Sequence, residues 1–96
     1  MLMIRLNVFF EKKEGADAAQ LDALCNELVE KSLSDNGNVA YDYFKSNTRP
    51  GTGMICETWQ DADVLKAHMA SAHFTDLVPK IEALTKGGLK LEQFEF

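Results

Sequence analysis

The only tryptophan and both histidines of this 96-residue chain lie between Glu57 and Phe74, in the stretch ETWQDADVLKAHMASAHF. Imidazole has an ordinary pKa near neutrality, so a histidine can both accept and return a proton. His68 follows Val64 by four residues and Leu65 by three, a spacing that places it on the apolar face of a helix. Two interpretations follow for His68: a core histidine with one hydrogen bond, or an acid–base group in a pocket between helix and sheet.

The spacing of the two histidines does not predict a metal site. His68 and His73 are five residues apart, which on one continuous helix turns their rings about 140° away from each other. Histidine pairs that bind zinc on a helix are separated by four residues, which places both rings on one face. We therefore expect no metal ligands here, although a helix break near Ser71 would bring the two rings together.

A carboxylate between two apolar side chains is expected in the strand that precedes this helix. Ile55, Glu57 and Trp59 alternate along the run, so all three face the same way. If that face is covered, Glu57 needs a hydrogen-bond donor or a substrate group as its partner. The alternative is an ion pair with Lys45 or Arg49 near an edge. Trp59 is interpreted either as core or dimer packing or as a hydrogen-bond donor in the site.

Two polar side chains of the first predicted strand could also belong to a site. Arg5 and Asn7 lie on the side opposite Ile4 and Leu6. Asparagine is disfavoured within strands, so Asn7 indicates either a polar role in an apolar cavity or simple exposure to solvent. The sequence has no glycine-rich phosphate loop, and no nucleophile–histidine pattern can be recognised from spacing.

The composition is that of one globular domain spanning residues 1–96, with 46% hydrophobic and 26% charged residues. A net charge of −5 with scattered basic residues argues against nucleic acid or an anionic membrane as a partner. We expect neither a membrane span nor a signal peptide. Cys25 and Cys56 are far apart in the sequence, which predicts reduced thiols in a cytoplasmic protein.

The order of predicted elements is strand, helix, strand, strand, helix, strand. Strands are predicted at 3–10, 38–46, 53–60 and 89–96, and helices at 17–33 and 62–84. A kink or break is expected between Ser71 and Pro79 because proline lacks an N–H. This order predicts an α+β, ferredoxin-like split βαββαβ fold, with two helices on one face of a four-stranded antiparallel sheet. The strands are apolar on both sides, so we predict a homodimer whose sheets pack face to face.

The segment from Tyr41 to Phe74 resembles the antibiotic biosynthesis monooxygenase domain, especially its quinol monooxygenase-like members. The typical run of that family is an aromatic strand, an S/N-x-x-x-P-G hairpin, the motif E-x-W, a helix with A-H, and then S-x-H-F. The corresponding residues here are Tyr41 to Phe44, Ser46 to Gly51, Glu57 to Trp59, Ala67-His68 and Ser71 to Phe74. These motifs extend over about a third of the chain and are specific, and the flanking strands and first helix fit the length and order of the family.

The resemblance implies a dimeric ferredoxin-like α/β barrel with a pocket between sheet and helices. It also implies a monooxygenase that acts on a quinol or phenolic small molecule with no metal, flavin or other cofactor. The implied catalytic residues are His68 as the base, Glu57, and Trp59 and Asn7 as hydrogen-bond donors. The implied substrate-binding residues are Tyr41, Tyr43, Phe44, His73, Phe74 and Arg5.

Relatives with other activities leave alternatives open. An isomerase of a phosphorylated autoinducer sugar would use the same proton-transfer groups and would need Arg5 or Lys45 for the phosphate. Haem-degrading members use an asparagine, a tryptophan and a histidine, and this chain has Asn7, Trp59 and His68. A non-catalytic module that binds small molecules or serves a stress response is the remaining alternative.

Overall fold

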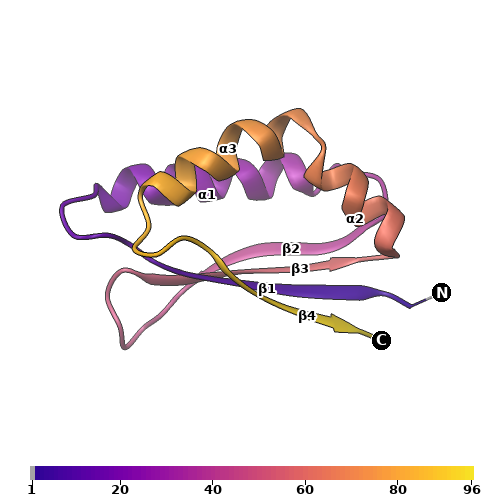
Figure 1. The fold of residues 1–96 in the computed structure, drawn as a ribbon, viewed down its shortest axis with the longest axis horizontal. Helices are drawn as coiled ribbons and strands as arrows, with labels where there is room; N and C mark the ends of the chain where they lie inside the picture. The colour runs from indigo at the N-terminus through magenta and orange to yellow at the C-terminus, as the bar shows by residue number, and fades with distance from the viewer. Residues whose placement is uncertain (1) are drawn as a thin grey trace.

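The chain folds as a four-stranded antiparallel sheet with its helices on one side (Figure 1). The structure is a computed structural model and describes residues 2–96. Its elements are β1 (Ile4–Glu11), α1 (Ala18–Ser32), β2 (Asn38–Lys45), β3 (Thr52–Trp59), α2 (Ala62–Met69), α3 (Ala72–Ala83) and β4 (Lys90–Glu95). The strand order β2-β3-β1-β4 is that of a ferredoxin-like fold. The α+β prediction is confirmed, except that two helices, α2 and α3, replace the single second helix.

Strand alternation decides which side chains reach the core between sheet and helices. Every second residue of β1 from Ile4 to Phe10 is buried. The antiparallel register pairs Leu6 with Glu57 and Ile4 with Trp59, so the same face of β3 is buried as well. The helices complete the core with Leu21, Cys25, Leu28, Leu65, Leu77, Val78 and Ile81. The predicted shared face of Glu57 and Trp59 is therefore the helix-covered face.

One serine hydroxyl separates α2 from α3. The Ser71 Oγ accepts a hydrogen bond from the Phe74 N–H at 3.3 Å and donates to the carbonyl oxygen of His68 at 2.6 Å. Ser71 is thus the N-cap of α3 and also holds the last turn of α2. The break predicted between Ser71 and Pro79 is present at Ser71. Its cause is the cap made by the Ser71 hydroxyl and not the proline. Pro79 lies inside α3 and does not end it.

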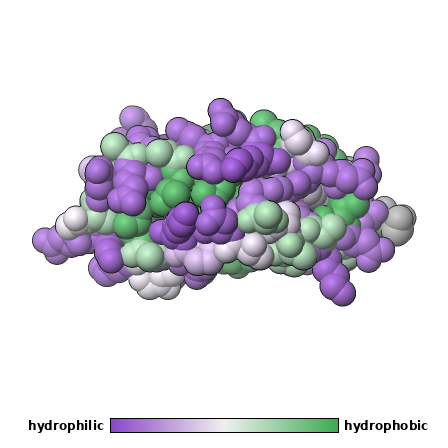
Figure 2. All heavy atoms as spheres, turned by 90° about the horizontal axis from the view of Figure 1, so that it is seen from above, coloured by the Kyte–Doolittle hydropathy of each residue, from purple (hydrophilic) through white to green (hydrophobic). Residues whose placement is uncertain are grey.

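The opposite face of the sheet carries large exposed apolar side chains. Phe9 alternates with buried neighbours in β1, so its ring points away from the helices. Phe9, Phe44, Phe94 and Phe96 have exposed fractions from 36% to 51%. The helix-covered side is instead mostly hydrophilic, with smaller hydrophobic patches (Figure 2). The open sheet face therefore exposes four aromatic rings, which agrees with the predicted apolar pattern on both sides of the strands.

For residues 2–96, the structure agrees with two further expectations: thiols that are not joined in a disulfide and helices that do not span a membrane. Cys25 is buried in the core, Cys56 is half-buried, and both are free thiols. Within residues 2–96, no helix is both long and apolar enough to cross a membrane.

Replacing Ser71 by alanine is expected to lower the free energy of unfolding by about 1 kcal/mol, because the orphan N–H groups of α3 lose their acceptor. Ser71→Thr retains a hydroxyl at the cap and should keep most of this stability. Urea unfolding followed by the fluorescence of Trp59 measures both variants. Equal losses in the two variants would contradict the capping role.

Candidate active site

A carboxyl group, an indole and an imidazole meet where α2 covers the sheet. The Trp59 Nε1–H donates to Glu57 Oε1 at 2.9 Å. The ring of His68 packs against the indole, with 4.4 Å between centroids, and its Nε2 lies 4.0 Å from Glu57 Oε1. All three side chains are buried. Glu57 therefore takes a hydrogen bond from Trp59, and the alternative of an ion pair with Lys45 or Arg49 is wrong.

Asp35 joins this cluster, although sequence reasoning missed it. Its Oδ2 lies 2.7 Å from Nδ1 of His68 and 2.8 Å from Nε2 of His73. The expected divergence of the two histidines is wrong, because the cap at Ser71 redirects the chain and leaves their ring centroids 5.8 Å apart. The only hint in the sequence was an acidic residue within the helix-ending stretch SDNGN, which by itself indicates a turn.

The turn after α1 places Asp35 beside α2. The Asp35 N–H donates to the carbonyl oxygen of Ser32 at 3.0 Å, which closes the turn. Gly37 follows with a φ of 79°, and a Cβ atom there would lie 2.6 Å from the methyl groups of Val64. Only glycine combines this backbone conformation with so close an approach. Gly37 thus lets the turn pack on α2 and brings the Asp35 carboxylate to His68.

Burial sets the ionisation of the central pair. It raises the pKa of Glu57 to about 7, against the opposing effects of the Trp59 N–H and the Tyr41 hydroxyl. Burial also lowers the pKa of His68, while Asp35 acts in the opposite direction. Near neutral pH, Glu57 can therefore gain or lose a proton beside a neutral imidazole. With its Nδ1–H assigned as the donor to Asp35, His68 carries the lone pair on Nε2, which has no hydrogen-bond partner within residues 2–96.

An apolar cavity of about 70 Å³ adjoins Glu57 between the sheet and the helices. Tyr41 and Glu57 contribute the polar side chains of its wall. The other lining residues are aliphatic, aromatic or thioether side chains: Leu6, Val8, Leu28, Ile55, Met69, Phe74, Val78, Ile81, Leu89 and Leu91. His68 and Trp59 lie behind Glu57 and are not part of the wall. A carboxyl group with a pKa of about 7 facing an apolar space is suited to proton transfer.

The predicted aromatic wall is only partly assembled. Tyr41 and Phe74 line the cavity, and the Phe74 ring lies 5.3 Å from that of His68. Tyr43 lies on the same side of the sheet, but its hydroxyl donates to Asp22 at 2.8 Å, away from the cavity. Phe44 is exposed on the open face. The structure therefore brings two of these four predicted aromatic residues to the cavity.

Arg5 and Asn7 lie on the open face of the sheet, because they alternate with the buried residues of β1. The Arg5 Nε–H donates to Thr58 Oγ1 at 2.9 Å. The haem alternative requires Asn7, Trp59 and His68 to meet in one site. Within this chain they do not, because Asn7 lies on the opposite face of the sheet from the other two. Arg5 is likewise on the wrong side of the sheet to bind a phosphate in the cavity.

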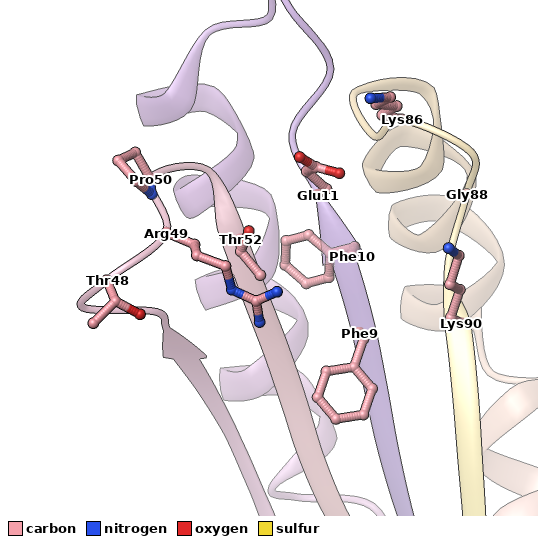
Figure 3. Close-up of a pocket in the computed structure, with 10 residues that line it drawn as sticks. All are labelled: Phe9, Phe10, Glu11, Thr48, Arg49, Pro50, Thr52, Lys86, Gly88 and Lys90. Carbon is pink, nitrogen blue, oxygen red and sulfur yellow. The ribbon is translucent and has the colours of Figure 1, made fainter.

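A larger cavity of about 510 Å³ lies at the far end of the sheet from His68 (Figure 3). Phe9 stands at its base, with Arg49 from the β2–β3 hairpin on one side and Lys86 and Lys90 on the other. Its lining contains none of the four residues predicted as catalytic. The residues predicted as acid–base groups, Glu57 and His68, therefore lie elsewhere, and Glu57 lines the smaller cavity.

The fold and the cluster define the class of protein: a ferredoxin-like domain with a carboxyl–imidazole site between sheet and helices. Residues 3–80 match the family described as antibiotic biosynthesis monooxygenase, and the chain belongs to this family. This confirms the resemblance seen in the sequence.

Three similar proteins share this fold or sequence. YcnE of Bacillus subtilis (strain 168), named provisionally as a monooxygenase, is 32% identical over 68 residues, which are 71% of this chain and 72% of YcnE. A Bacteroides thetaiotaomicron protein of unknown function, described as a possible oxidoreductase, is 46% identical with a TM-score of 0.91, covering 99% of this chain and 98% of that one. A structure described as an antibiotic biosynthesis monooxygenase is 30% identical with a TM-score of 0.82 and 95% coverage of both chains.

The stability of the protein relative to its Glu57→Gln variant is expected to fall as the pH rises from about 4.5 to about 7. In this window the folded chain holds the Glu57 proton that the unfolded chain has released, so the free energy of unfolding decreases with rising pH. The decrease is expected to reach about 3 kcal/mol. Urea unfolding across this pH window measures it, with Glu82→Gln at an exposed position of α3 as the control. A difference that is constant with pH would contradict the raised pKa.

Proposed function

We propose that this chain is a cofactor-independent monooxygenase of a quinol or phenolic small molecule. The observation that carries the proposal is the position of Glu57, an ionisable group in the wall of an apolar cavity, held by Trp59 and backed by His68. Membership of the antibiotic biosynthesis monooxygenase family supports the reaction class.

The chemistry begins with removal of the phenolic proton by the Glu57 carboxylate. Ground-state oxygen is a triplet, and an electron-rich phenolate can pass it one electron, which gives a substrate radical and superoxide. The radical pair joins through a new C–O bond, and the peroxide takes a proton from Glu57. Loss of water from the resulting hydroperoxide leaves a carbonyl group, so one oxygen atom enters the substrate and the other leaves as water.

Neighbouring residues fit supporting roles in this reaction. The Trp59 N–H holds the Glu57 carboxyl in place, and the lone pair on His68 Nε2 offers the proton a second acceptor. Burial raises the pKa of Tyr41, so its hydroxyl stays protonated and can donate to a substrate oxygen. His68 thus assists the deprotonation through Glu57, since Glu57 lines the cavity and His68 does not.

The cavity must widen to admit such a substrate. Its volume of about 70 Å³ is well below the roughly 300 Å³ at which small-molecule pockets begin. Met69 and Leu91 line it and are 42% and 59% exposed. A methionine has three rotatable bonds and repacks easily. We therefore place substrate entry at the edge formed by Met69 and Leu91.

A second copy of this chain is the proposed partner for the open sheet face. That face exposes Phe9, Phe44, Phe94 and Phe96, and monomers rarely leave an apolar surface of this kind uncovered. Pairing about a two-fold axis would place the same residues of both chains against one another. The homodimer would bury this face while the cavities beneath the helices stay separate.

Glu57→Gln is expected to lower the rate of oxygen uptake with a reduced naphthoquinone about 100-fold, the usual loss when a general base is removed. An oxygen electrode measures the rate, with EDTA present so that free metal ions do not catalyse autoxidation. Glu82→Gln, at an exposed position of α3, should keep the wild-type rate. Wild-type uptake no faster than the background would overturn the oxygenase proposal, and quinol binding without uptake would make the chain a binding module.

Phe44→Glu is expected to convert the protein from dimer to monomer, because it places a charge in an apolar interface. Leu33→Glu introduces the same charge at an exposed site at the end of α1 and should leave the dimer intact. Light scattering during gel filtration gives the mass of each. A monomeric wild-type protein, or dissociation by both variants alike, would contradict packing through the sheet.

A further inference from the structure

We infer that Asp35, His68 and His73 form a binding site for a divalent transition-metal ion such as Zn²⁺. Each residue offers one ligand atom, and the three atoms lie within 4.8 Å of one another. Imidazole nitrogens and carboxylate oxygens are preferred Zn²⁺ ligands. Because the ligands come from the turn after α1, from α2 and from the first turn of α3, only the folded chain brings them together.

The distances between the Asp35 carboxylate and the two imidazole nitrogens are hydrogen-bond distances, as expected when N–H protons occupy the site and no metal is bound. Asp35 Oδ2 lies 2.7 Å from Nδ1 of His68 and 2.8 Å from Nε2 of His73. Zn²⁺ bonds of about 2.0–2.1 Å at tetrahedral angles separate neighbouring ligand atoms by about 3.3 Å. The ion would replace the N–H protons, and the carboxylate would move away from each nitrogen by roughly half an ångström. Side-chain rotation is sufficient for such a change.

The far side of His68 supplies an independent observation. Its Nε2 is buried, has no hydrogen-bond partner within residues 2–96 and lies 4.0 Å from Glu57 Oε1. A metal on Nδ1 requires the proton to be on Nε2, which then faces the Glu57 carboxylate. Metal-ligating histidines almost always direct their second N–H at a carboxylate or carbonyl group. The metal-bound tautomer would therefore give the unpartnered nitrogen a donor role, with a carboxylate oxygen 4.0 Å away that a small side-chain movement would bring to hydrogen-bond distance.

An open cavity connects two of the three proposed ligands, Asp35 and His68, to solvent. This cavity has a volume of about 280 Å³ and is lined by Asp35, Asn36, Asp63, Val64, Ala67 and His68. It offers space for a water molecule as the fourth ligand, which three-residue zinc sites retain. The carboxylates of Asp35 and Asp63 give this opening a negative charge that favours a cation.

Isothermal titration of the untagged, EDTA-treated protein with Zn²⁺ tests the inference, with one ion bound per chain as the expected result. His73→Gln and Asp35→Asn should each weaken binding at least tenfold. Asp76→Asn, which removes an exposed carboxylate of α3, should not. Circular dichroism confirms that each variant is folded. The test is independent of the proposed oxygenation, because its readout is binding.

Co²⁺ gives a second, spectroscopic readout. Bound at this site, it should show visible absorption of a low-coordinate nitrogen–oxygen site and quench the single tryptophan, whose ring lies 4.4 Å from that of His68. Both signals should be lost in His73→Gln. Absence of Zn²⁺ binding, or unchanged affinity in both His73→Gln and Asp35→Asn, would overturn the metal site.

Discussion

The carboxyl group of Glu57 is buried on the helix-covered face of the sheet, where an unpartnered charge would cost several kcal/mol. Hydrogen bonds from Trp59, at 2.9 Å, and from Tyr41 favour its ionised form, and the neutral imidazole of His68 packs beside it. His68 in turn depends on Asp35, whose turn can reach α2 only because Gly37 lacks a side chain. Positions in β3, α2 and the turn after α1 are thus linked by the burial of one acidic group.

The division between α2 and α3 is the second constraint. Ser71 joins the carbonyl oxygen of His68 to the first turn of α3 through one hydroxyl group. The relative direction of His68 and His73 is therefore set by the backbone, and both rings arrive at the same oxygen atom of Asp35. On a continuous helix His73 would point elsewhere, and the Asp35 carboxylate would have one imidazole as its neighbour.

Local periodicity was sufficient to predict most of the fold and the burial of Glu57, Trp59 and His68 between the sheet and the helices. The period of two placed Glu57 and Trp59 on one covered face, and the period of the helix turned His68 inward. Asp35 could not be found this way, since its role arises from a turn that meets α2 only in the folded chain. Alternation also placed Asn7 correctly, on the side of β1 opposite Ile4 and Leu6. Its implied role as a donor in the site came from the resemblance, and it fails because that side is not the one the helices cover.

The group that occupies the space between Asp35 and Nδ1 of His68 decides what Nε2 can do. A proton there leaves a lone pair on Nε2, which in the proposed reaction would accept the proton that Glu57 takes from the substrate. A metal ion bound there would require the imidazole proton to be on Nε2, so that His68 would be a donor toward Glu57. The two states exclude each other in one chain, since the same ring cannot be both acceptor and donor at Nε2. Occupation of the proposed Asp35 site would therefore alter proton transfer at Glu57, although neither Asp35 nor His68 lines the cavity.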